Sequence, residues 1–241
     1  MTPGAVAVLE VAGLVRAFDG VRALDGVDLA VARGEMVALI GPNGAGKTTC
    51  FNVIDGQLRA DAGHVRVAGR AIDGLAPDAI ARRGIGRTFQ IAATFASMSV
   101  RENVEVARRA LGRPSDTRSV DALLGGVGAG ALAGRHAAIL AYGDAKRVEL
   151  ALALAGEPHL LLLDEPTAGL AAADRGALMR VVRTRVDVDG VAVLFTEHDM
   201  DVVFTFADRV IVLDRGRVIA QGTPDAVRGN ADVRRAYLGD G

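Results

Sequence analysis

Residues 41 to 49 have the sequence Gly41-Pro42-Asn43-Gly44-Ala45-Gly46-Lys47-Thr48-Thr49. An apolar run at 36–40 precedes this stretch and apolar residues at 50–54 follow it, so the expected order is strand, glycine loop, helix. In that context the pattern predicts a phosphate-binding loop, because backbone N–H groups converge on an anion at a helix N-terminus. We expect all nine residues to surround a nucleoside triphosphate, with Lys47 on the β- and γ-phosphates and the Thr48 hydroxyl on Mg²⁺.

The alternative is a glycine-rich turn that happens to precede a helix, since the chain contains 30 glycines. The use of lysine argues against this alternative. Of 28 basic residues only Lys47 and Lys146 are lysine, and the rest are arginine. A planar guanidinium does not replace a compact ammonium inside a phosphate loop. The sequence therefore favours nucleotide binding.

Composition narrows the class of protein. The chain has 241 residues, half of them apolar, which suits one large domain or a core domain with an inserted lobe. No apolar run reaches the roughly 18 to 20 residues that cross a bilayer, and no signal peptide is recognisable, so we expect a soluble chain that is not exported. The single cysteine, Cys50, suits a reducing compartment and a small packed side chain. A net charge of −1 gives no reason to expect nucleic acid as a partner.

Apolar and polar residues alternate over residues 6–31, around the turn-like pairs Asp19-Gly20 and Asp25-Gly26. This pattern predicts short antiparallel strands that lead into the strand at 36–40. Phe18 lies in this segment. Its ring either belongs to the core or stacks on an adenine ring, and residue type alone favours the core.

The segments after the phosphate loop alternate between strand and helix patterns. We predict a strand at 63–69 and a short helix at 77–83 that ends at Gly84. From about 91 to 157 the pattern is helical and broken by glycine, above all at 124–130, where the composition indicates a flexible junction. We infer an inserted helical lobe in this part of the chain.

Two strands that are predicted to be buried end in polar residues. The leucine run 160–163 precedes Asp164 and Glu165. In a phosphate-loop enzyme the first carboxylate holds Mg²⁺ through its water shell and the second acts as general base, whereas the alternative is a surface turn. The run 191–196 brings His198 to the same carboxyl edge of the sheet, where ligands of open α/β sheets bind. His198 is therefore a candidate contact of the γ-phosphate.

The remaining polar candidates are interpreted as structural. Three histidines are expected at the surface or in structural positions: His64, His136 and His159. A hairpin is predicted over 209–221, turning at 214–216. Thr223 and Pro224 are expected to cap and begin a closing amphipathic helix.

Taken together, these residues resemble the ATP-binding cassette (ABC) ATPases over essentially the whole chain. That family has a glutamine at the lobe junction, matched by Gln90, and a histidine after a later strand, matched by His198. Its signature, close to L-S-G-G-Q, opens a helix before the strand with the acidic end. The matching segment is Leu140-Ala141-Tyr142-Gly143-Asp144. The resemblance implies an α/β fold of the P-loop NTPase type, with a mixed central sheet, an antiparallel β subdomain and an inserted α-helical lobe.

The resemblance also implies boundaries and roles. It divides a single ABC ATPase domain, residues 1–241, into a nucleotide-binding core (residues 1–90 and 158–241) and a helical lobe (residues 91–157). It implies ATP and Mg²⁺ as cofactors, with Thr48, Gln90 and Asp164 on the metal. Glu165, His198 and Gln90 are then the catalytic residues. Phe18 becomes the adenine stack, and the signature contacts come from Ala141, Tyr142 and Gly143.

The motifs are most similar to those of the ATPase subunits of bacterial branched-chain amino acid importers, through residues 86–90, the Tyr-Gly-Asp signature, residues 197–200 and the tail at 236–239. Such cassettes work in pairs, with each ATP held between the P-loop of one and the signature of the other. The resemblance implies a second ABC ATPase subunit, identical or not, and transmembrane permease subunits. A periplasmic solute-binding protein would be an indirect partner. The chain would then lie in the cytoplasm, peripherally on the cytoplasmic face of the inner membrane.

Three positions depart from the family pattern. Ala141 lacks the hydroxyl of the commonest signature serine, and Ala171 lies where an Asp or Asn usually couples the two sites. The segment 103–140 is shorter than we expect of the branched-chain subgroup. An ATPase for lipid or lipopolysaccharide export is therefore an alternative. A nucleotide-dependent switch without turnover is another, although Glu165 and His198 argue against it.

The stretch from Ile91 to about Glu105 is the candidate docking segment. It contains Phe95, Met98 and Val100 with few charges. Composition alone allows plain core as readily as a docking surface. In the resembled family the equivalent groove receives a short helix of the membrane subunit, so we expect the permease to contact this segment.

Overall fold

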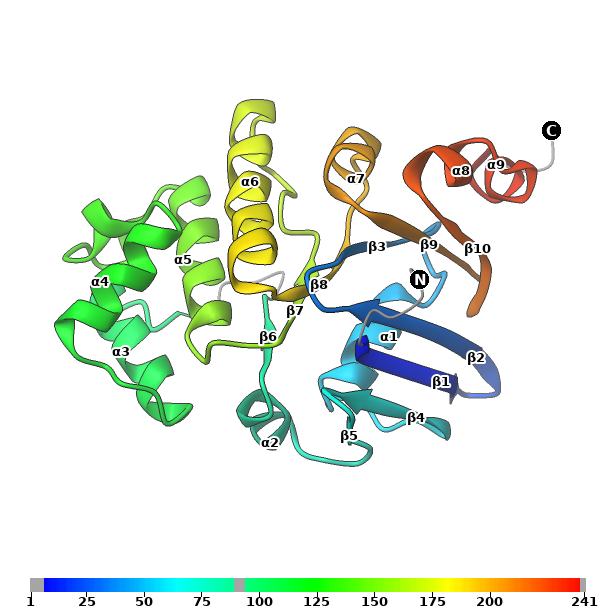
Figure 1. Cartoon of the computed structure of the whole chain (residues 1–241), viewed down its shortest axis with the longest axis horizontal. Coiled ribbons are helices and arrows are strands. Elements are labelled where there is room, and N and C mark those ends of the chain that lie inside the picture. The colour runs from blue at the N-terminus through cyan, green and yellow to red at the C-terminus, as the bar shows by residue number, and fades with distance from the viewer. Residues whose placement is uncertain (1–6, 89–93, 239–241) are drawn as a thin grey trace.

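The computed structural model describes residues 7–88 and 94–238, although not the side chains of 236–238. Two sheets and several helices build this part of the chain, with the larger sheet in the centre of Figure 1. Within these ranges no helix combines the length and the apolar character that crossing a membrane requires.

The central sheet has six strands in the order β10, β9, β3, β8, β7, β6. Neighbouring strands are parallel except β9 and β10, so the sheet is mixed, as expected. β3, β7 and β8 are buried along their whole length, which explains their unbroken apolar sequences. The strands are β3 (Met36–Ile40), β6 (Ile85–Arg87), β7 (Leu160–Asp164), β8 (Ala192–Thr196), β9 (Arg209–Asp214) and β10 (Arg217–Gly222).

The second sheet is antiparallel, in the order β2, β1, β4, β5. Its strands are β1 (Ala7–Phe18), β2 (Val21–Ala32), β4 (Ala62–Val67) and β5 (Arg70–Ala71). The predicted turn at Asp19-Gly20 joins β1 to β2. The second predicted turn was wrong, because Asp25-Gly26 lies inside β2. Gly26 has φ 78° where the register with β1 shifts, so it belongs to a β-bulge that bends a strand longer than predicted.

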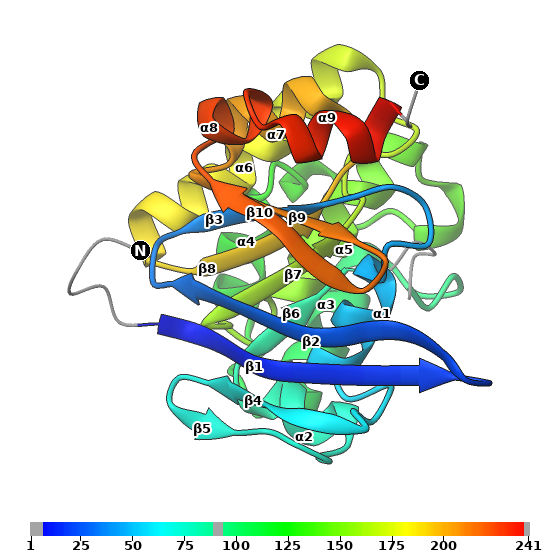
Figure 2. The same cartoon turned by 90° about the vertical axis from the view of Figure 1, so that its right-hand side faces the viewer.

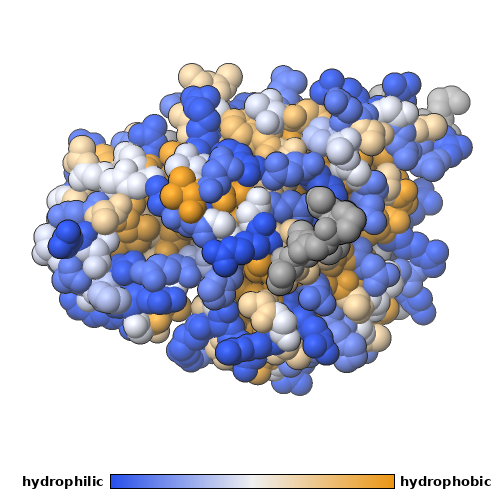
Figure 3. Space-filling model, in the orientation of Figure 1, coloured by the Kyte–Doolittle hydropathy of each residue, from blue (hydrophilic) through white to orange (hydrophobic). Residues whose placement is uncertain are grey.

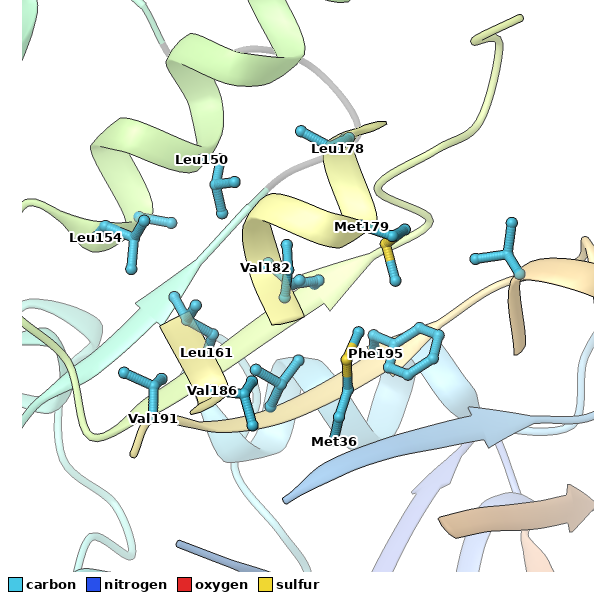
Figure 4. Packing of buried hydrophobic residues seen from close by; sticks show 14 of the residues in the cluster. Met36, Leu150, Leu154, Leu161, Leu178, Met179, Val182, Val186, Val191 and Phe195 are labelled. Atoms are coloured by element: carbon cyan, nitrogen blue, oxygen red, sulfur yellow. The ribbon is translucent and has the colours of Figure 1, made fainter. Parts of the chain in front are cut away.

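Successive residues of the central strands point to opposite faces of the sheet and fill two separate cores. On one face Leu161 and Phe195 lie opposite Val182 and Met179 of α6 (Figure 4). On the other face Leu160 and its neighbours pack with α1 (Lys47–Ile54) and the antiparallel sheet. The helices that cover the first face are α5 (Tyr142–Leu154), α6 (Ala172–Asp189) and α7 (Met200–Phe206).

Residues 100–154 form the group of helices on the left of Figure 1. These are α3 (Val100–Ala110), α4 (Thr117–Gly126), the 3₁₀ turns η1 (Gly130–Leu132) and η2 (Ala137–Ile139), and α5. The predicted flexible junction at 124–130 was wrong. Residues up to Gly126 belong to α4, and Leu124, Val127 and Ala129 are buried in the first core. The apolar residues between the glycines fix this segment.

Further short helices lie in the described part of the chain. The helix predicted at 77–83 is α2 (Pro77–Arg82). The closing helix predicted to begin at Thr223 and Pro224 is α8 (Pro224–Arg228), and a second helix that was not predicted, α9 (Ala231–Leu238), follows it. Thr223 caps α8 as expected, and the Asn230 side chain accepts from the N–H groups of Asp232 (2.8 Å) and Val233 (3.3 Å), which starts a second helix. Both helices lie along the β10 edge of the molecule (Figure 2).

Candidate functional site

The phosphate loop lies between the C-terminal end of β3 and the first turn of α1. Gly46 has φ 107°, and a Cβ added there would be 2.4 Å from the Ala23 carbonyl oxygen of β2, so only glycine fits this approach. The Ala45 carbonyl accepts from the Gly216 N–H (2.9 Å), which ties the loop to the β9–β10 turn. Gly44, by contrast, has open space around it. The loop is therefore held from behind and open in front, as an anion site requires.

Lys47 is buried at the start of α1. Its Nζ donates to the carbonyl oxygens of Gly41 (2.7 Å) and Pro42 (3.0 Å). Burial lowers the pKa of Lys47, and the nearby carboxylates of Glu165 and Asp164 oppose that shift. Since two backbone carbonyls are the hydrogen-bond partners of the ammonium among the described residues, a phosphate can replace them at little structural cost. Thr48, one residue further, is exposed and free to reach the same ligand.

Asp164 ends β7 and is buried. Its Oδ1 accepts from the hydroxyl of Thr196, the last residue of the neighbouring strand β8, at 2.7 Å. The Thr196 Oγ1 also accepts from the Glu165 N–H (3.0 Å), so one hydroxyl fixes both acidic residues. On the other side the Arg87 guanidinium lies 3.6 Å from Asp164 and pairs with Asp55. These contacts fix the position of the Asp164 carboxylate at the end of β7.

Glu165 and His198 meet at the end of the sheet, where Glu165 Oε1 and His198 Nε2 are 3.0 Å apart. Glu165 has φ 48°, a left-handed conformation that is strained for a residue with a side chain and typical of functional sites. The turn is held by Glu197, which is buried and accepts from the Thr167 N–H (2.8 Å) and hydroxyl (2.7 Å). A carboxylate and an imidazole are therefore kept in contact at a half-exposed edge.

Sequence reasoning brought Asp164, Glu165 and His198 to this edge but assigned no role to the residues that hold them. Thr196, Glu197 and Arg87 were missed. The first two carried a signal, because polar residues at the end of a strand buried on both faces need partners. Arg87 carried none, since its partners Asp55 and Asp164 lie far away in the sequence.

Two predicted residues stand apart from this arrangement. Phe18 ends β1 at the exposed tip of the first hairpin, with the Arg16 guanidinium 4.7 Å from the centre of its ring. It is not a core residue, and its face is shared with a cation. Gln90 lies outside the described residues, so its role as a metal ligand and catalytic residue stays a prediction.

The signature segment begins α5, with Ala141 as its N-cap residue and no side-chain cap. The Tyr142 hydroxyl donates to the Ala168 carbonyl (3.0 Å), in the loop between β7 and α6. Gly143 lies beside Leu170 of the same loop. α5 and α6 pack on one face of the central sheet, whereas the phosphate-loop helix α1 packs on the other. Within one chain the sheet therefore lies between the signature helix and the phosphate-loop helix.

The donor set suits Mg²⁺ bound together with a nucleotide. Over the described residues no group of three or more His, Cys, Asp or Glu side chains could hold a metal by itself. Asp164 offers one braced carboxylate and Thr48 one exposed hydroxyl. Mg²⁺ typically takes one or two protein oxygens, several waters and the phosphates of its ligand, so these two residues fit it.

Comparison with known proteins decides the family. Residues 24–168, which are more than half of the chain, match the family described as ABC transporter. The chain belongs to the ABC transporter family. This ABC protein is an ATP-binding cassette ATPase of α/β fold, as its motifs predicted. Its last residues, 217–241, match a second family, described as branched-chain amino acid ATP-binding cassette transporter.

Relatives match the ABC chain over nearly its whole length. It is 38% identical to the high-affinity branched-chain amino acid transport ATP-binding protein BraF of Pseudomonas aeruginosa, over 97% of this chain and 98% of that protein. It is 37% identical to LivG of Escherichia coli, with the same coverage. Among solved structures, the ADP conformation of an ATP-binding cassette of an ABC transporter superposes with a TM-score of 0.88 at 30% identity, covering 98% of this chain and 100% of that one. A dimeric bacterial ABC transporter cassette gives 0.81 at 26% identity, covering 90% and 98%.

Proposed function

We propose that this cassette energises the uptake of branched-chain or related amino acids through separate permease subunits. The observation that supports this cargo best is the match of residues 217–241 to the branched-chain family, because this segment lies outside the part that matches ABC transporters in general. The near full-length relatives BraF and LivG bear the same transport name. We place the chain peripherally on the cytoplasmic face of the inner membrane, where a permease would meet it.

We assign the chemistry to the end of the central sheet. The phosphate loop, residues 41–49, binds the phosphates, and Lys47 exchanges its two carbonyl partners for them. Thr48, Asp164 and Gln90 would hold Mg²⁺, which would neutralise phosphate charge. Glu165 takes the proton of the attacking water, and His198, 3.0 Å from it, orients Glu165 and reaches the γ-phosphate. Phe18 stacks on the adenine.

We further propose that two cassettes enclose two nucleotides. Because α5 and α1 pack on opposite faces of the central sheet, we assign the contacts of Ala141, Tyr142 and Gly143 to the ATP of another copy or of a related subunit. The dimeric cassette among the structural neighbours is consistent with such a pair. Ala141 contributes no hydroxyl, so its contact would use backbone N–H groups at the helix end.

The permease would contact the segment around Phe95, whose surface is 55% exposed. Buried Asn103 holds this segment, since its side chain accepts from the Phe95 N–H (2.7 Å) and donates to the Phe95 carbonyl (3.1 Å). An aromatic side chain presented on a braced loop suits an interface anchor.

On the face in Figure 3 hydrophilic residues predominate, and apolar ones gather in small patches between them.

Substitution of Phe95 tests the interface. We expect Phe95→Glu to abolish co-purification with the permease and ATP-driven uptake, while the isolated cassette still folds and binds ATP. Val188→Glu is the matched control, since Val188 is 74% exposed on α6. Equal uptake by the Phe95→Glu and wild-type complexes would contradict the docking assignment.

Two further measurements test the function. Vesicles with the complete transporter should accumulate labelled leucine when ATP is supplied, and accumulation of lipid or lipopolysaccharide in place of leucine would favour the exporter.

Glu165→Gln keeps the shape of Glu165 but removes the base, so phosphate release should stop while ATP still binds and traps a dimer. Normal phosphate release by Glu165→Gln would refute the proposed base, and none by the wild-type chain would favour a switch.

A further inference from the structure

The loop between β7 and α6, residues 166–171, is held rigidly on the side of the reaction centre. Its Thr167 is bound twice by Glu197, the neighbour of His198. At its other end the Leu170 carbonyl accepts from Arg175 Nε (2.8 Å), and Arg175 also pairs with Asp199. This 166–171 loop therefore moves with the segment that presents His198.

Tyr142 connects that loop to the signature segment. Its hydroxyl donates to the Ala168 carbonyl at 3.0 Å. The ring lies against Gly169, where an added Cβ would come within 3.0 Å of the Tyr142 Cε1 and 3.2 Å of its oxygen, and where φ is 76°. A residue with a side chain at 169 would be strained and would push the ring away. Tyr142 is nevertheless 54% exposed, so this contact lies at the surface rather than in a core.

The position of Tyr142 is fixed from its own helix as well. The Lys146 Nζ lies 5.7 Å from the centre of the Tyr142 ring, one turn further along α5. Lys146 is itself buried and pairs with buried Glu149 at 3.1 Å. The tyrosine thus has a defined place between a buried ion pair and the backbone of the 166–171 loop.

Ala171, the last residue of the loop, adds no tie of this kind. It is the N-cap residue of α6 and makes no side-chain hydrogen bond to that helix. The contact from Tyr142 to Ala168 instead joins two segments within one chain.

We propose that the Tyr142 hydroxyl has a positioning role beyond the ATP contact assigned to this segment: it ties the start of α5 to the 166–171 loop, so that both segments approach a second cassette as one unit. The proposal rests on the proposed pairing of cassettes for its consequence, but the tie itself exists within a single chain. Removing the hydroxyl should therefore loosen the loop before any nucleotide is added and weaken the closed pair afterwards.

Amide hydrogen exchange of the nucleotide-free chain tests the tie. The N–H groups of Ala168 and Leu170 are bonded within the loop, to the carbonyls of Glu165 and Thr167 (3.1 Å each). In Tyr142→Phe their exchange should be about three- to tenfold faster, the range that a lost hydrogen bond gives. Thr184→Val removes an exposed hydroxyl bonded to the Arg180 carbonyl and should leave these amides unchanged. Unchanged exchange in Tyr142→Phe would overturn the tie.

Dimerisation tests the consequence. In a Glu165→Gln background, the dissociation constant of the ATP-bound dimer, measured by analytical ultracentrifugation, should rise about three- to tenfold with Tyr142→Phe and stay constant with Thr184→Val. A lower thermal midpoint of the nucleotide-free chain with an unchanged dimer constant would mean that Tyr142 only stabilises the fold, and would overturn the proposal. If Glu165→Gln alone forms no dimer with ATP, the pairing of cassettes is refuted and the positioning role with it, whereas the exchange experiment still decides the tie.

Discussion

The hydroxyl of Thr196 is the most informative single group to remove, because it bonds both acidic residues of the site. In Thr196→Val the Asp164 carboxylate loses a buried, charge-assisted hydrogen bond of 2.7 Å. The Glu165 N–H keeps a partner, since it also lies 3.2 Å from the Thr196 carbonyl. Loss of a hydrogen bond to a charged group costs about 1.5–3 kcal/mol. For a chain of this size each kcal/mol lowers the thermal midpoint by about 2–4 °C, so we expect a decrease of about 3–12 °C.

The assay compares thermal unfolding of the nucleotide-free proteins with their ATPase turnover at saturating ATP. Thr196→Val should also hydrolyse ATP at least about tenfold more slowly, because the Asp164 carboxylate is then misplaced. An activation free energy that is higher by about 1.4 kcal/mol corresponds to that factor. Thr196→Ser retains the hydroxyl and should recover most of the turnover. Thr184→Val, the same change at an exposed position, should stay within about 0.5 kcal/mol of wild type. A wild-type thermal midpoint for Thr196→Val, or turnover of Thr196→Ser as slow as that of Thr196→Val, would refute the reasoning.

Three other predictions follow from the described geometry. Lys47→Ala should lose ATP affinity and turnover, because the charge-assisted contacts to phosphate disappear; titration with a fluorescent ATP analogue checks this, and wild-type affinity would contradict the phosphate-loop assignment. Phe18→Ala should weaken the binding of ATP more than the binding of a triphosphate that lacks a nucleobase, and an equal loss of affinity for both ligands would argue against stacking. Burial raises the pKa of the Cys50 thiol from 9.0 to about 12. As the pH rises, the unfolded chain therefore loses the thiol proton at a lower pH than the folded chain, and the free energy of unfolding should fall between pH 9 and 12. Urea titrations across that range should show a smaller fall for Cys50→Ala, and identical slopes would exclude the thiol as the cause.

The sequence predicted the parts of the site that are local in the chain. The phosphate loop is formed by nine adjacent residues, 41–49, and strand β7 together with Glu165 by six, 160–165. Apolar runs without alternation correctly indicated strands that are covered on both faces. Such features are specified by neighbours in the sequence, which is why a motif is sufficient to predict them.

Three of the misses have a common physical origin, since each depended on contacts between distant residues. Strand β6 has three residues, and it exists because Ile85 pairs with Leu160 of β7. The bulge at Gly26 depends on its partner strand β1, and the burial of Leu124 depends on the helices around it. Glycine led to the wrong prediction of a turn at Gly26 and of flexibility at 124–130, and tertiary packing overrode this local preference.

The order of strands in the central sheet has a consequence for how the chain is made. β3, which leads into the phosphate loop, lies between β8 and β9, and these strands begin only at residues 192 and 209. During translation the entirely apolar strand β3 therefore has neither β8 nor β9 to pair with until most of the chain has left the ribosome. Unpaired apolar strands aggregate, so nascent or prematurely terminated chains are exposed to this hazard. A cassette that stops short of β8 has its phosphate loop in full but lacks both strands that pair with β3.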